Sequence, residues 1–96
     1  MEINIQSVNF ENSESLNAYV TKKVSKLGRF GDVGTAEVAL RILNTSDKSN
    51  REISIRLQAG GQEFFASRKA EAFEEAVVQS VEILERQLVK AKEKKQ

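Results

Sequence analysis

Residues 70–96 carry one continuous apolar stripe that no helix breaker interrupts. The chain contains no Pro, and no Gly follows Gly61, so a helix of about seven turns is possible over this stretch. Its apolar side chains recur at three- and four-residue spacing, which places them on one side of that helix. They are Phe73, Ala76, Val77, Val81, Leu84, Leu88 and Ala91. A helix with so long an apolar face needs a partner surface, which the rest of the chain must supply.

The charged side chains of this predicted helix change sign along its length. The acids are Glu71, Glu74, Glu75, Glu82 and Glu85, and the cations Arg86, Lys90, Lys92, Lys94 and Lys95 follow, with only Glu93 among them. The helix dipole favours this order by about 0.3 to 1 kcal/mol per placement, so dipole complementarity is one interpretation. The other is that Arg86, Lys90 and Lys94, spaced i, i+4, i+8, form an exposed cationic row along which phosphates could lie. The sequence is compatible with both.

Length and composition limit the possible functions. With 96 residues, the chain predicts a single small domain over residues 1–96, whose last residues fray. The absence of Cys and His excludes disulfides, thiolate or imidazole metal sites, and nucleophilic mechanisms that need a Cys or a His base. The glutamates of the predicted helix have no apolar pocket or cofactor beside them that general acid/base catalysis would need. We therefore predict a protein that is not an enzyme and that uses no cofactor and no metal.

No apolar run approaches the roughly 18 residues of a membrane span, and the chain opens on strand-like alternation instead of a signal peptide. These features predict a cytoplasmic protein with no membrane partner. Its 15 Lys and Arg against 14 Asp and Glu give a net charge of +1. Because the total is near zero, an electrostatic argument for a partner depends on where the charges lie.

Several stretches alternate apolar and polar residues with the period of a half-buried strand. They cover residues 2–8, 35–43, 52–58 and 62–67. The polar run 44–50 turns the chain between two of them. Gly60-Gly61 suits a two-residue hairpin turn, which we favour over a ligand cradle at that place.

A first helix is predicted between the first two strands, with Asn12 or Ser13 as its N-cap and with Gly28 and Gly31 marking its end. Its apolar positions are Leu16, Tyr19, Val20, Val24 and Leu27. Its last part holds cations with no acid among them, namely Lys22, Lys23, Lys26 and Arg29. Such a run forms either a solvated face or a binding surface.

The predicted order is β-α-β-β-β-α, which is an α+β fold. Its first β-α-β unit places two strands parallel, and the remaining strands form an antiparallel meander. We expect a two-layer sandwich in which both helices cover one face of a four-stranded mixed sheet, as in double-stranded-RNA-binding domains. The two helices are then neighbours, so the cations of the first can join Arg86, Lys90 and Lys94 in one patch. Such a patch favours the phosphate backbone of structured RNA as the partner.

The opposite sheet face is left to solvent and offers a different interpretation. It carries Glu37, Arg41, Glu52, Ser54, Arg56 and Gln58. Phe65 points the same way and is either a lone exposed aromatic or a platform on which a base could stack. A protein-interaction module that uses this outer face, and a general structured-RNA binder, are therefore the alternative functions.

The ordered set of motifs resembles the ribosome hibernation-promoting factor family, also called ribosome-associated inhibitors. The likeness covers nearly the whole chain and runs through Ile3-Asn-Ile5, Tyr19-Val-Thr-Lys-Lys-Val-Ser-Lys-Leu27, Leu57-Gln-Ala-Gly-Gly-Gln-Glu-Phe-Phe-Ala-Ser67 and Leu84-Glu-Arg-Gln-Leu-Val-Lys-Ala-Lys-Glu-Lys94. The resemblance implies the same fold. It also implies binding to rRNA of the small ribosomal subunit in the mRNA and tRNA channel, with inhibition of translation in stationary phase or stress. The chain looks like the family's short form, for which ribosome pairing would either need a second factor or not occur.

Carried over by position, the resemblance implies rRNA contacts from Lys23, Lys26, Arg86, Gln87, Lys90, Lys92 and Lys94, and helical geometry adds Lys22 and Arg29. The start of the last helix departs from the family. Ala72-Phe73-Glu74 stands where Asp, then Met or Leu, then Tyr is common, and Arg68 and Lys69 add positive charge just ahead of it. Contacts made by that helix start are therefore not carried over.

Overall fold

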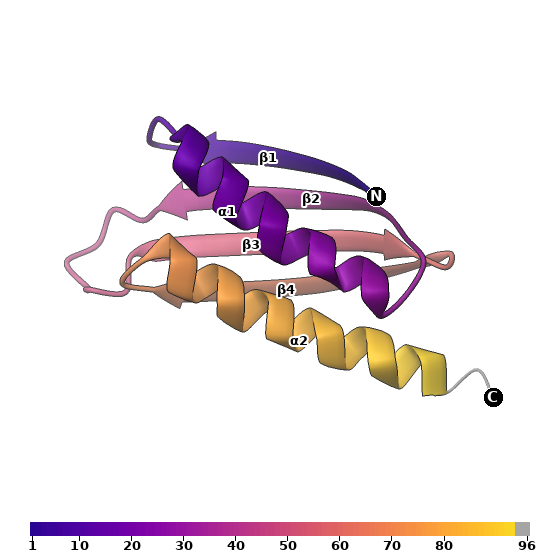
Figure 1. Ribbon diagram of the computed structural model, residues 1–96. Helices are drawn as coiled ribbons and strands as arrows, with labels where there is room; N and C mark the ends of the chain where they lie inside the picture. The colour runs from indigo at the N-terminus through magenta and orange to yellow at the C-terminus, as the bar shows by residue number, and fades with distance from the viewer. Residues whose placement is uncertain (94–96) are drawn as a thin grey trace.

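A computed structural model describes residues 1–93 of the chain. Its elements are β1 (Glu2–Val8), α1 (Glu14–Ser25), the short 3₁₀ helix η1 (Lys26–Arg29), β2 (Val33–Ile42), β3 (Arg51–Ala59), β4 (Gln62–Ala70) and α2 (Phe73–Glu93) (Figure 1). The order β-α-β-β-β-α that alternation and helical periodicity predicted is confirmed.

The strands form one four-stranded sheet in the order β1-β2-β3-β4. β1 pairs parallel with β2, while β2–β3 and β3–β4 pair antiparallel. Both helices lie on the same face of this sheet (Figure 1). The predicted two-layer α+β sandwich is therefore confirmed, with its outer sheet face left uncovered by helices.

The hydrophobic core lies between the helices and the inner face of the sheet. The central strand β3 contributes Ile53, Ile55 and Leu57, and α1 contributes Val20 and Val24, all fully buried. The apolar stripe of α2 closes the core with Phe73, Ala76, Val77, Val81, Leu84 and Leu88. Burial of this stripe is what holds α2 on the sheet, since apolar burial is the dominant favourable term in folding.

The local signals act as predicted at the first helix and at the hairpin. Of the two candidates Ser13 is the N-cap, because its hydroxyl accepts from the Leu16 N–H at 3.1 Å, while the side-chain oxygen Oδ1 of Asn12 accepts from the Ser13 N–H at 2.8 Å. Gly60 and Gly61 have φ of 56° and 78°, which is the left-handed region that a two-residue hairpin requires. The predicted turn between the last two strands is confirmed.

Several element boundaries differ from those predicted. α1 ends at Ser25 and the chain tightens into η1, because Gly28 is a poor helix former and 3₁₀ turns commonly end α-helices. β2 spans 33–42 instead of 35–43. β4 continues past Ser67, since Ala70 pairs with Arg51 and is buried in the core, so α2 begins only at Phe73.

No helix within residues 1–93 is long and apolar enough to cross a membrane. The predicted fraying of the C-terminal end and the contact expected from Lys94 concern residues outside the described range.

Candidate nucleic-acid interface

The two helices run in the same direction across the sheet, so their C-terminal ends converge at one end of the molecule (Figure 1). The β3–β4 turn lies at this same end (Figure 1). Each helix places a partial negative charge at its C-terminus, which favours cations there. The sequence supplies Lys22 and Lys23 in the last turn of α1, and Lys90 and Lys92 in the last turn of α2.

The cations of α1 and η1 form a cluster that we call the first basic cluster, made of Lys22, Lys23, Lys26 and Arg29. The positive charge of Lys23 is the main cause that lowers the pKa of Lys26 below its ordinary value of 10.5, followed by desolvation and by Lys22 and Arg29. The Lys23 ammonium lies 5.5 Å from the centre of the Tyr19 ring. The positive charges of this cluster therefore repel one another, and a bound polyanion would reduce that repulsion.

The cations of α2 lie on two sides of the helix. Lys92 lines the same two depressions as Arg29 of η1, so it is on the side toward α1. Gln87 lies on the opposite side, because its amide donates to the Phe65 carbonyl of the edge strand β4 at 3.1 Å. Lys90 comes two residues after the buried Leu88, which places it on the solvent side of α2. Arg86 and Lys90 are both exposed.

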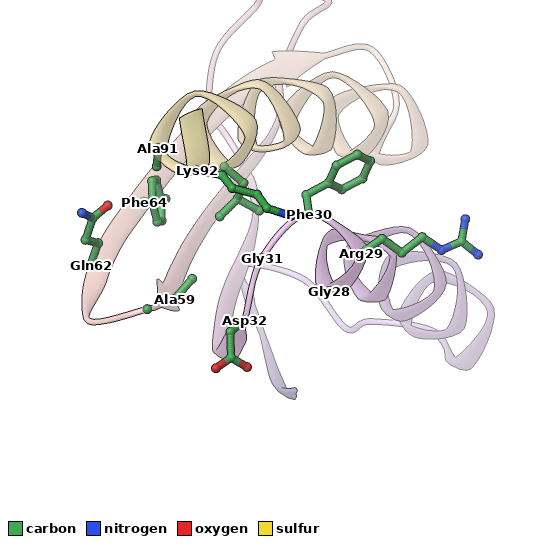
Figure 2. A pocket seen from close by; sticks show the side chains of 12 residues that line it. Gly28, Arg29, Phe30, Gly31, Asp32, Ala59, Gln62, Phe64, Ala91 and Lys92 are labelled. Carbon is green, nitrogen blue, oxygen red and sulfur yellow. The ribbon is translucent and has the colours of Figure 1, made fainter. Parts of the chain in front are cut away.

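A depression of about 460 Å³ separates the ends of the two helices from the β3–β4 turn (Figure 2). Its apolar wall is made by Phe30, Phe64, Leu88 and Ala91. Figure 2 shows the Lys92 side chain extending from α2 toward Phe30, while the Arg29 side chain points away from the depression. Nothing in the sequence pattern indicated this depression, because Phe30 and Phe64 are far apart in the sequence and line it together only in the folded chain.

The predicted single patch stays a prediction. Arg29 and Lys92 line the same two depressions at the junction of the helices. Arg86 and Lys90 are four residues apart and exposed on the side of α2 opposite the buried Leu88, as expected of neighbours in a cationic row. Within residues 1–93, no cluster of acidic side chains is arranged to hold a metal ion.

The fold and these charges define a class of protein: a two-layer α+β domain with the basic ends of both helices on one side. The chain belongs to the Sigma 54 modulation protein / S30EA ribosomal protein family, whose model matches residues 3–96. This description is that of a ribosome-associated factor and not of an enzyme family.

Similar proteins agree with this membership. The chain is 31% identical over 94 residues to a ribosome hibernation promoting factor of Azotobacter vinelandii, covering 98% of this chain and 85% of the relative. Its fold is similar to the N-terminal domain of Thermus thermophilus Protein Y, with a TM-score of 0.81 at 23% identity over 94% of this chain and 98% of that one. It is also similar to a ribosomal subunit interface protein from Coxiella burnetii, with a TM-score of 0.80 at 20% identity over 96% and 98% of the two chains. The resemblance drawn from the sequence motifs is confirmed at the level of the family.

Proposed function

We propose that this protein is a ribosome hibernation factor that occupies the mRNA and tRNA channel of the small ribosomal subunit and thereby inhibits translation in stationary phase or stress. The observation that carries the proposal is the convergence of two basic helix ends in a chain of this family. Inhibition then follows from occupancy alone, and the protein needs no chemistry. A cytoplasmic location is part of the same proposal.

The physical basis is attraction to phosphate. The first basic cluster holds closely spaced positive charges with no acid among them, so its charge repulsion falls when phosphates lie beside it. Lys92 of α2 lines the same depressions as Arg29, so it adds a cation on the side toward α1. Contacts of this kind position a protein on folded RNA without reading its bases.

The residues proposed to contact rRNA are Lys22, Lys23, Lys26, Arg29, Arg86, Gln87, Lys90, Lys92 and Lys94. Gln87 differs from the others because one amide N–H already donates to the Phe65 carbonyl. Its carbonyl oxygen and second N–H are still available to RNA. Its main part in the proposal is to fix α2, which carries Arg86 and Lys90, against the edge strand β4.

The test is sedimentation of the purified protein with salt-washed small subunits, at low and moderate salt, with and without competing mRNA and tRNA. We expect co-sedimentation that weakens at higher salt and is lost on competition. The double variant K26E/K90E should lose binding while its circular dichroism spectrum is unchanged.

The matched control is K48E/R68E, which makes the same change in net charge at exposed residues away from the converging helix ends. This control should co-sediment like the parent. Undiminished binding of K26E/K90E, or equal loss in the control, would contradict the proposal. Binding to free duplex RNA as tight as to subunits would instead identify a general structured-RNA binder.

A further inference from the structure

The outer face of the sheet is organised by the strand register into rows that cross all the strands. One row, which we call the small row, is Gln6, Ala39, Ser54 and Ser67. The row on one side of it is Asn4, Glu37, Arg56 and Phe65. The row on its other side is Val8, Arg41, Glu52 and Lys69. Each flanking row is two residues from the small row along every strand. This is a distance of about 7 Å, because each residue of a strand rises by about 3.3 Å.

On each of the two central strands, the charged side chains on the two sides of the small row have opposite signs. On β2, Glu37 lies on one side and Arg41 on the other. On β3 the signs are reversed, with Arg56 beside Glu37 and Glu52 beside Arg41. The arginines are exposed, with side-chain accessibilities of 48% for Arg41 and 58% for Arg56. The face therefore has alternating charge, unlike the basic helix ends on the opposite side of the molecule.

This pattern is complementary to itself. A two-fold rotation about an axis along the small row exchanges the two flanking rows between facing copies. Glu37 of one copy then lies opposite Arg41 of the second copy, and Arg56 lies opposite Glu52. The same operation places the exposed ring of Phe65 opposite the ammonium of Lys69, a pairing that aromatic rings favour. We propose that the outer sheet face is a self-association surface, and that its partner is a second copy of this chain.

The small row gives the facing sheets room to approach. Ala39 and Ser54 lie in a shallow depression of about 280 Å³ on the outer face, with Phe65 at its edge. Small side chains at the centre allow two sheets to pack face to face at the usual separation of about 10 Å. The sheets' twist separates the corners, so the charges of the central strands β2 and β3 make the closest pairs.

The size of this face determines how strong the dimer is. Four strands about 4.8 Å apart, each contributing about five residues with a rise of about 3.3 Å, offer roughly 320 Å² per copy. A stable complex buries about 800 Å² per partner, so this dimer is weak and reversible. Its exposed ion pairs make it sensitive to salt. Because the helices cover the opposite sheet face, association leaves the proposed RNA surface free, and each proposal can fail without the other.

The test is analytical ultracentrifugation of the full chain over a series of concentrations at low and high salt. We expect association that rises with concentration and weakens as salt is added. In the single variants E37R and R41E, two like-charge contacts replace two ion pairs, so self-association should weaken about tenfold or more. Circular dichroism of each variant checks its fold.

The decisive experiment mixes the two charge-reversal variants. A mixture of E37R and R41E restores opposite charges between unlike copies and should associate as a heterodimer, as should the double variant E37R/R41E with itself. The controls E82R and K48E change exposed charges away from this face and should associate like the parent. A parent that is monomeric at all concentrations overturns the proposal, as do single variants that associate normally or a mixture that does not associate.

Discussion

Ser80 is fully buried in the apolar face of α2. Its hydroxyl has no hydrogen-bond partner among residues 1–93. Burying a hydroxyl without a partner costs about 1 to 3 kcal/mol. We expect S80A to leave the free energy of unfolding unchanged or to raise it by up to about 1 kcal/mol, measured by urea denaturation. The matched deletion S13A should lower it by about 1 kcal/mol, because it removes the N-cap bond to Leu16. Clear destabilisation by S80A would show that this hydroxyl is satisfied.

The pKa of Lys26 reports on the positive charges that surround it in the first basic cluster. Lys23 is the largest cause of its lowered pKa, so K23M, which keeps an apolar stem, should raise the pKa of Lys26 toward 10.5. An NMR titration of the Lys26 side chain measures this, with K48M as a control that changes nothing. A Lys26 pKa that does not respond to K23M would contradict the clustering.

The sign of the accompanying pH effect follows from linkage. A lowered lysine pKa in the folded state means that the unfolded chain binds the proton more tightly. The Lys26 contribution therefore destabilises the protein below the lowered pKa and disappears as pH rises through the ordinary lysine value. Stability should rise with pH over this window in the parent, and less so in K23M.

At the scale of elements, the contact between α2 and the edge strand β4 links packing to the interface. Gln87 bonds the Phe65 carbonyl, whereas Gln79 bonds only Glu75 of its own helix, at 3.4 Å. We expect Q87M to lower the free energy of unfolding by about 0.5 to 1.5 kcal/mol, because it removes a contact between elements. Amide hydrogen exchange in β4 and the last turns of α2 should quicken.

The control for that experiment is Q79M, which should change stability by less than about 0.5 kcal/mol. Equal effects of Q87M and Q79M would show that the bond to Phe65 does not hold α2 in place.

At the scale of the whole molecule, the parallel direction of the helices separates charge along the long axis of 46 Å. The acidic first turn of α2, with Glu74 and Glu75, lies at one end, and the basic last turns of both helices lie at the other. The dipole interpretation and the binding interpretation therefore do not exclude each other. Cations that suit the helix termini are also gathered into one field at one end of the molecule.

This field predicts the salt dependence of binding to small subunits. In a plot of log binding constant against log salt, K92M should reduce the slope by about 0.7 to 0.9 if Lys92 neutralises one phosphate. K48M, in the loop between β2 and β3, should leave the slope unchanged. A slope near zero for the parent would exclude a phosphate interface.

Much of the fold could be predicted from local pattern, whereas the site residues stay predictions. The alternation of Ile53, Ile55 and Leu57 identified a strand, and the Gly60-Gly61 pair identified its turn, because both depend on neighbouring residues only. The end of α1 and the start of α2 were less accurate. They depend on where η1 tightens and on the pairing of Ala70 across to Arg51, which is a contact between distant residues.

The sequence alone determined the elements, their order and the family, because period, caps and motifs are properties of consecutive residues. The tertiary structure decided which flank of each helix meets which neighbour. It brought Arg29 and Lys92 to the lining of one depression, bound Gln87 to the Phe65 carbonyl, and aligned Glu37 with Arg56 in a row of the outer face. These relations depend on the rotation of each helix about its axis and on strand register, and only packing of the complete core sets both.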